Sequence, residues 1–157
     1  MGILIQQNEL KELVCKLKQD KKTVVFTNGC FDILHVGHVR YLRESAKLGD
    51  ILILGLNSDS SIKRLKGKNR PINTQNDRAE VLCALSCVDY VIVFDEDTPE
   101  NLIEQIKPDI YTKGADYTLD TLKEALIVKK NGGKVEFIEL VEGKSTTNTI
   151  SKMKKCK

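Results

Sequence analysis

Short apolar runs alternate with amphipathic stretches along this chain, and that alternation most constrains its fold. The runs are rich in β-branched residues and apolar at successive positions, which is typical of strands in a parallel sheet covered on both faces. Strands are expected over residues 22–27, 50–56, 89–94, 109–112 and 134–140. Because strands and helices take turns, the sequence predicts an α/β fold with a Rossmann-like, doubly wound, five-stranded parallel sheet.

Helical signals lie between these strands. An amphipathic helix is expected over 7–19, within an N-terminal segment of residues 1–20. Thr98 predicts an N-cap with Pro99 at the first helical position, and Pro108 ends that helix. The remaining helices are expected over 37–48, after Thr74, over about 119–130 and from near Ser145, where a C-terminal helix and tail (145–157) close the chain. A length of 157 residues suits one hydrophobic core, so we expect a single domain over 1–157.

Composition limits the class of protein. The formal net charge is +3, too small to indicate a nucleic-acid partner. No apolar run approaches the roughly 18 residues that a membrane span needs, so no membrane partner is expected. The five cysteines are odd in number and include no Cys-x-x-Cys pair, which favours reduced thiols. The first residues, MGILIQQNEL, lack the features of a signal peptide, so we expect a cytoplasmic location.

The two histidines of the chain, His35 and His38, lie together in the stretch FTNGCFDILHVGH, residues 26–38. This stretch joins a predicted strand to a predicted helix, and in doubly wound sheets ligands bind at the carboxyl ends of strands. Gly29 lets the backbone approach a phosphate closely, and Gly37 keeps the first helical turn free of a side chain. The helix start presents N–H groups to an anion. The stretch therefore predicts phosphoryl chemistry on a nucleotide, with both histidines donating hydrogen bonds to the phosphate.

Rival interpretations of this stretch explain it less well. The motif G-x-G-x-x-G is absent, and the GKST of 143–146 does not complete a P-loop because Ile138 stands where that loop requires glycine. A zinc site needs more ligands than two histidines and Asp32, so no protein-bound metal is expected. A purely structural pair of histidines leaves the two glycines and the aspartate unexplained. Direct in-line transfer needs no nucleophilic side chain, so Cys30 is interpreted as a small packing residue.

The motif NGCFDILHVGH resembles the signature of the HxGH nucleotidyltransferase superfamily, which includes cytidylyltransferases, phosphopantetheine adenylyltransferase and class I aminoacyl-tRNA synthetases. Within it, the chain is most similar to the adenylyltransferases of ADP-heptose synthesis, which occur as the C-terminal half of a bifunctional protein and as separate enzymes. The resemblance covers nearly the whole chain. Matching segments, in order, are FTNGCFDILHVGHVRYL, LGD, NSD, KRLKGKNRPIN, R-x-E-V-L, EDTPENLI, KGADY, NGGKVEF and STTNTI.

The resemblance implies a reaction of ATP with D-glycero-β-D-manno-heptose 1-phosphate that gives ADP-heptose and pyrophosphate, with Mg²⁺. It implies that His35 and His38 stabilise the transferring phosphate, and that Lys66 and Arg70 act from a mobile loop over the phosphates. Asp32 would orient the signature turn and help to hold the metal. ATP-binding roles are implied for Thr27, Asn28, Gly29, Cys30, Phe31, Gly37, His38, Lys113, Gly114, Ser145, Thr146 and Thr147. Substrate-binding roles are implied for Asp32, Asn57, Asp59, Arg78, Asp116 and Tyr117.

Several of these residues also have a simpler interpretation. Lys66 and Arg70 are otherwise solvated loop charges, and Arg78 is otherwise a charge on the surface of a helix. Asp116 is also typical of a turn, and residues 145–147 are also typical of a helix cap. These alternatives stay open at the level of the sequence.

Two departures from the family pattern bear on the acceptor, because Ala115 stands where a second glycine is common and 119–130 matches loosely. A cytidylyltransferase for glycerol 3-phosphate or a related alcohol phosphate, or an FAD synthetase, is the nearest alternative. A non-catalytic nucleotide- or RNA-binding module, suggested by basic residues 63–70 and the tail, belongs to a different class. The resemblance further implies a homodimer, a separate upstream sugar kinase that this chain has no room for, and a product used in lipopolysaccharide synthesis.

Overall fold

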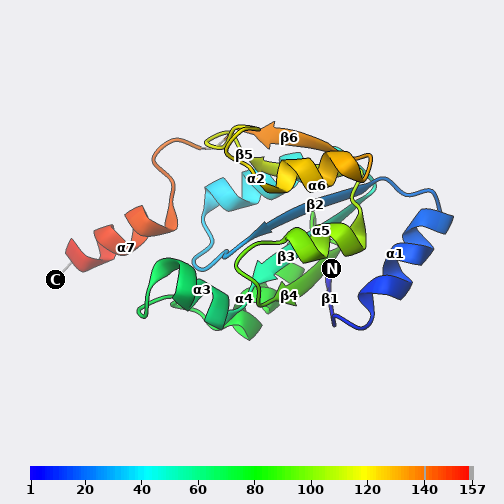
Figure 1. Cartoon of the computed structure of the whole chain (residues 1–157). Helices are drawn as coiled ribbons and strands as arrows, with labels where there is room; N and C mark the ends of the chain where they lie inside the picture. Colours follow the sequence, from blue (N-terminus) through cyan, green and yellow to red (C-terminus); the bar gives the residue numbers. More distant parts are fainter. Residues whose placement is uncertain (140, 156–157) are drawn as a thin grey trace.

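The computed structural model describes residues 1–139 and 141–155 and arranges them as one sheet with helices on both faces (Figure 1). All strand pairs are parallel, in the order β1-β4-β3-β2-β5-β6. The strands are β1 (Ile3–Ile5), β2 (Val24–Gly29), β3 (Ile51–Asn57), β4 (Tyr90–Phe94), β5 (Ile110–Gly114) and β6 (Lys134–Ile138). The predicted α/β class and Rossmann-like parallel sheet are confirmed.

The predicted number of five strands is wrong, because the sheet has six. All five predicted strands are present, and the additional one is β1, which pairs with β4 at the edge of the sheet. A strand of three residues is too short for a hydrophobic period to distinguish it from the apolar start of a helix.

The described residues form seven helices: α1 (Leu10–Gln19), α2 (Val36–Ala46), α3 (Asp59–Lys66), α4 (Gln75–Cys83), α5 (Glu100–Ile106), α6 (Glu124–Lys130) and α7 (Thr146–Lys155). Two predicted helix starts are wrong. Pro99 is the N-cap of α5 and no side chain caps it, so Thr98 does not have the predicted role. The segment expected to be helical from about 119 becomes an α-helix only at Glu124.

Helix α3 was not predicted, and it includes Lys66, which was expected to lie with Arg70 on a mobile loop. The Ser58 side chain accepts a hydrogen bond from the Ser61 amide and caps its start. Asp59 lies in the first turn and the basic residues in the last turn, as the helix dipole favours. Ile62 is the one apolar residue that the helix buries completely, so its hydrophobic period is weak.

Two hydrophobic clusters fill the space between the sheet and the helices. On one face, α1, α5 and α6 cover sheet residues that include Val24 and Phe26. On the other face, α2 and α4 cover sheet residues that include Val25 and Leu54. Successive residues of β2 thus enter opposite clusters, as strand geometry requires when both faces are covered.

The order of strands reverses at β2. The chain moves outward from β2 through β3 to β4, and then crosses to place β5 and β6 on the other side of β2. In sheets of this kind a crevice opens at the carboxyl ends of the strands where the order reverses. Helix α7 has no buried residue and lies beyond this end of the sheet (Figure 1).

Candidate active site

A pocket of about 550 Å³ opens at the carboxyl ends of β2, β3 and β5. All but three of the predicted site residues line it; the exceptions, Thr27, Asp59 and Arg78, do not reach it. The predicted residues in the lining are Asn28, Gly29, Cys30, Phe31, Asp32, His35, Gly37, His38, Asn57, Lys66, Arg70, Lys113, Gly114, Asp116, Tyr117, Ser145, Thr146 and Thr147. The fold therefore brings together residues that are more than a hundred positions apart in the sequence.

The two histidines cap the start of α2 together. His35 is the N-cap, and its Nδ1 accepts a hydrogen bond of 3.1 Å from the Gly37 amide. His38 occupies the third helical position, and its Nδ1 accepts a bond of 3.4 Å from the His35 amide. The rings stack with centroids 3.9 Å apart. A Cβ on Gly37 would lie 2.8 Å from Cε1 of His35, so glycine makes room for the ring.

These hydrogen bonds define the protonation of both rings. A nitrogen that accepts a hydrogen bond carries no proton, so the proton of each neutral ring is on Nε2. Burial, together with the charges of His35 and Lys66, lowers the pKa of His38 to about 4. Burial and the charge of Lys144 also lower the pKa of His35. Both rings are therefore neutral near pH 7 and present an Nε2–H donor, as hydrogen bonding to a phosphate requires.

The signature turn, residues 29–35, adopts an unusual backbone conformation. Phe31 has φ 44°, in the left-handed region that is costly for a bulky residue. Its buried ring lies against His38, with centroids 5.3 Å apart. A Cβ on Gly29 would lie 2.8 Å from the Phe31 ring, so Gly29 accommodates this ring in addition to leaving the backbone bare.

Asp32 connects the signature turn to the segment after α3. Its buried carboxylate accepts hydrogen bonds from Arg70 Nε at 2.7 Å and from the amides of Ile72 and Asn73, at 2.9 Å each. Burial would raise the pKa of Asp32, but the hydrogen bonds from Asn73 and Ile72 and the charge of Arg70 outweigh it and lower the pKa. Asp32 therefore fixes the signature turn against residues 70–73.

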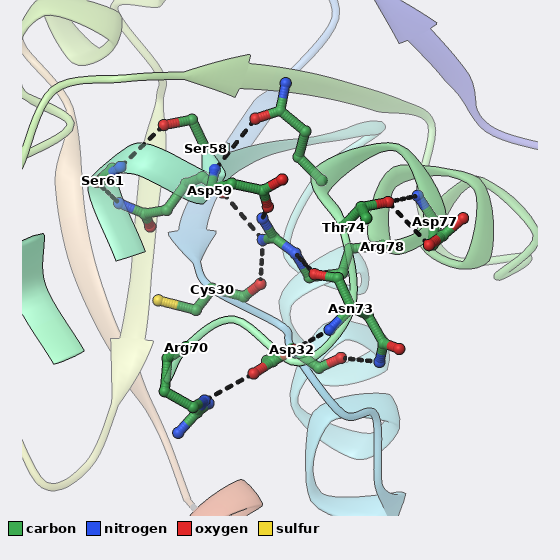
Figure 2. Close-up of polar contacts among 12 residues, drawn as sticks. Cys30, Asp32, Ser58, Asp59, Ser61, Arg70, Asn73, Thr74, Asp77 and Arg78 are labelled. Carbon is green, nitrogen blue, oxygen red and sulfur yellow. Dashed lines mark hydrogen bonds and ion pairs between the residues drawn. The ribbon is translucent and has the colours of Figure 1, made fainter. Parts of the chain in front are cut away.

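Arg78 holds four parts of the site together from below (Figure 2). Its guanidinium donates to the carbonyl oxygens of Cys30, Asn57 and Asn73, and pairs with Asp59 at 2.8 Å. The side chain is 1% exposed, so the interpretation as a surface helix charge is wrong. Because its Nε, Nη1 and Nη2 atoms all donate to protein acceptors, Arg78 supports the shape of the pocket from within the fold.

A buried group of hydroxyls lies under α2. Thr27 is fully buried, and its hydroxyl bonds to Tyr41 Oη at 2.7 Å and to the carbonyl of Thr112. The hydroxyl of Ser45 bonds to that of Thr112 at 2.9 Å. The Thr27 side chain, on β2, thus points toward α2 and bonds to Tyr41 and Thr112. It lies below the pocket in which Thr27 was predicted to contact ATP. Tyr41 does line the pocket, and its position one turn after His38 was the available signal.

Three cations face the pocket from the α3 and α7 sides. Lys66 is in the last turn of α3, and Arg70 follows in the loop. The Nη2 of Arg70 is buried without a hydrogen-bond partner among the described residues. The third cation, Lys144, lies with its Cβ 3.5 Å from the Cβ that Gly37 lacks, and it was missed although it belongs to the GKST stretch. These cations give one side of the pocket a positive charge.

The start of α7 closes this side of the pocket. The hydroxyl of Ser145 accepts a hydrogen bond from the Asn148 amide at 3.0 Å, so the interpretation of Ser145 as a helix cap is confirmed. Thr146 donates to the carbonyl of Ile33 in the signature turn. Thr147 also lines the pocket, so the helix start faces the histidines.

The opposite side of the pocket is formed by the end of β5 and the segment before α6. The Lys113 ammonium lies over the rings of Tyr111 and Tyr117, 5.8 and 5.3 Å from their centroids. Asp116 and Glu124 line the same side. Glu124 was not predicted, because it lies in the stretch that matches the family pattern loosely. Further lining residues to which no role was assigned are Leu65, Asp97 and Pro99, which lie in segments that match the family, and Val141, which does not.

The residues present do not form a site for Mg²⁺. Within residues 1–139 and 141–155, no group of three or more His, Cys, Asp or Glu side chains is arranged to hold a metal ion. Asp32, predicted to help hold the metal, already accepts hydrogen bonds on both carboxylate oxygens. Mg²⁺ commonly takes substrate phosphates and water as ligands, so it can reach such a pocket together with the nucleotide. In the same residues, no helix has the length and apolar character needed to span a membrane.

Comparison with known proteins agrees with this geometry. Residues 26–152 match the model of the cytidylyltransferase-like family. Bifunctional protein HldE from Syntrophotalea carbinolica is 54% identical over 94% of this chain and 30% of its own length. Bifunctional protein HldE from Campylobacter concisus is 57% identical over 95% of this chain, again 30% of its own length. The chain therefore spans about a third of the length of these curated relatives.

A solved structure is similar to this chain over nearly all of its own length. The lipopolysaccharide core biosynthesis protein from Thermoplasma volcanium GSS1 is 35% identical, with a TM-score of 0.64 over 78% of this chain and 99% of that one. The family match includes the signature turn, the histidine pair and the start of α7. The chain belongs to the cytidylyltransferase-like family, whose chemistry is nucleotidyl transfer.

Proposed function

We propose that this protein is an adenylyltransferase that transfers AMP from ATP to D-glycero-β-D-manno-heptose 1-phosphate. An oxygen of the sugar phosphate attacks the α-phosphorus of ATP, the bond from that phosphorus to the bridging oxygen breaks, and pyrophosphate leaves. The products are ADP-heptose and pyrophosphate. The observation that carries the proposal is the neutral histidine pair at the start of α2, whose two rings line a pocket rimmed by cations and keep Nε2–H free of the capping bonds.

The residues of the chain have separable roles in this reaction. His35 and His38 donate hydrogen bonds to phosphate oxygens, whose charge grows as the pentacoordinate phosphorus forms. Lys66, Arg70 and Lys144 offset the charge of the triphosphate and of the leaving pyrophosphate. Because in-line transfer depends on position and electrostatics, the bonds that fix the histidine rings contribute directly to the rate.

The choice of a heptose phosphate as acceptor draws on the relatives named HldE, at 54% and 57% identity. On this reading a separate sugar kinase makes the acceptor, the protein works in the cytoplasm and forms a homodimer, and its product is a precursor of lipopolysaccharide. The solved relative named for lipopolysaccharide core biosynthesis supports the same pathway.

A cytidylyltransferase acting on glycerol 3-phosphate is the second candidate, favoured by the description of the matching family. Release of pyrophosphate from the purified protein separates the two. ATP and CTP are each combined with Mg²⁺ and with heptose 1-phosphate, glycerol 3-phosphate or FMN. Release with ATP and the heptose phosphate alone supports the proposal, and release with a different pair replaces the substrate but keeps the reaction. Release with no pair, together with salt-sensitive RNA binding, would favour a binding module.

A further inference from the structure

The ammonium of Lys113 makes no ion pair among the described residues, although the carboxylates of Glu124 and Asp116 lie nearby. Within residues 1–139 and 141–155 no carboxylate lies within ion-pairing distance of Lys113, and no hydrogen bond is made by its side chain. The residue is partly buried and lines the pocket. A partly desolvated charge that makes no direct hydrogen bond or ion pair is costly, so such a residue in a pocket indicates an anionic ligand.

Two aromatic rings hold this charge in place without neutralising it. The Lys113 ammonium is 5.8 Å from the ring of Tyr111 and 5.3 Å from that of Tyr117, within the range of cation–π attraction. Tyr111 is fully buried, and its hydroxyl donates to the Asn28 side chain at 2.7 Å. Burial also lowers the pKa of Lys113, although the nearby acids Glu124 and Asp116 partly offset this effect. The cation is thus positioned before any ligand arrives.

The register of the sheet places Lys113 beside the signature turn. Phe26 of β2 is level with Tyr111 of β5, so two residues further along, Asn28 is level with Lys113. Lys66, Arg70 and Lys144 reach the pocket from α3, the following loop and the segment before α7. Lys113 therefore lies on a different wall from the three other cations.

Two polyanions must meet in this pocket if the proposed function is correct. The three cations and the starts of α2 and α7 suffice for the triphosphate. The opposite wall has Tyr117 and two acids, Asp116 and Glu124, whose carboxylates can accept hydrogen bonds from sugar hydroxyls but repel a phosphate. Lys113 is the one positive charge among the described lining residues of that wall. A phosphorylated polyol fits this combination, with its phosphate at Lys113 and its hydroxyls at the acids.

We propose that Lys113 binds the attacking phosphate of the acceptor and so determines the use of a sugar phosphate. This inference rests on the proposed function, and it assigns Lys113 to the acceptor where the family resemblance implies a role toward ATP. As the residue that holds the nucleophile, Lys113 sets acceptor affinity, and the affinity for ATP depends on the other wall.

The test replaces the charge while keeping the shape. Lys113→Met is compared with Lys129→Met, an exposed lysine of α6 that makes no ion pair among the described residues. Loss of one charge-assisted bond is expected to raise KM for heptose 1-phosphate about 10- to 100-fold. KM for ATP and the binding of α,β-methylene-ATP should change about twofold or less, and Lys129→Met should match the wild type. Equal weakening toward both substrates, or weaker binding of the ATP analogue alone, would overturn the inference.

A second measurement does not depend on turnover. Reductive methylation of Lys113 in the wild-type protein is followed by peptide mass spectrometry, with Lys129 as the internal reference. Heptose 1-phosphate should slow the labelling of Lys113 and leave that of Lys129 unchanged, whereas α,β-methylene-ATP should slow it less. Protection by the ATP analogue alone would contradict the assignment. If the wild type uses a different phosphorylated acceptor, the proposed function fails, and the same two experiments with that acceptor still decide the role of Lys113.

Discussion

The two walls of the pocket are built differently. The signature turn is fixed by hydrogen bonds from distant parts of the chain, with Asp32 binding Arg70, Ile72 and Asn73 and Arg78 binding three carbonyls. The β5–α6 segment, residues 113–124, is held mainly by local bonds such as those between Thr118 and Thr121. The contrast predicts that the signature turn is the more rigid wall, and that residues 113–124, which we propose face the acceptor, rearrange more easily.

Removing the buried arginine should break the rigid wall and have the largest effect. Arg78→Ala leaves three carbonyl acceptors and Asp59 without their donor. We expect the free energy of unfolding to fall by about 3–5 kcal/mol, as when a buried ion pair loses one partner. Chemical denaturation measures this. Arg64→Ala, which removes an exposed pair with Asp97, is the matched control and should cost far less. Similar losses in the two variants would show that the Arg78 contacts do not stabilise the turn.

Removing the ring of His35 or His38 tests the same wall through its effect on kcat. We expect His35→Ala and His38→Ala each to lower kcat by about 10²-fold or more, because a donor to the transition state is lost. Circular dichroism should show that both variants keep their secondary structure. Turnover close to that of the wild type in either variant would remove that histidine from the mechanism.

The protonation of His38 gives a third test, in which the sign follows from its low pKa. The folded pKa is about 4 and the ordinary value is 6.5, so between these values the unfolded chain binds a proton that the folded chain does not. The stability that depends on the neutral His38 ring is therefore fully present above about pH 6.5, and it is lost as the pH falls toward 4. His38→Gln should flatten this part of the profile by up to about one proton, and identical slopes would show that the ring is not held neutral.

The two walls also differ in how far the sequence predicts them. The histidine pair is local, because an N-cap and the third helical residue are neighbours in the sequence and cap each other. Its place at the start of a helix that lines the pocket was therefore predictable from a short motif. The contacts of Arg78 are with backbone carbonyls of three separate segments, and a carbonyl has no side-chain signature. Its burial could be known only from the fold.

Short elements were missed for a related reason. β1 has three residues and α3 buries little apolar surface, so neither gives a clear period. Lys144 was not predicted, because in the GKST stretch only the hydroxyl residues from Ser145 onward indicated phosphate binding, although the fold brings Lys144 beside Gly37. Glu124 belongs to no motif, and only the fold shows that it lines the pocket.

The smallest expected effect belongs to the acceptor wall itself. Glu124→Gln keeps the shape of the side chain but weakens its acceptor strength toward a hydroxyl. We expect KM for the sugar phosphate to rise about 3- to 10-fold, as for partial loss of one hydrogen bond, with KM for ATP unchanged. Glu80→Gln, at an exposed position of α4, is the matched control. A large loss of stability in Glu124→Gln would show that this wall is as tightly built as the signature turn. A change in KM for ATP instead would place the nucleotide, and not the acceptor, against α6.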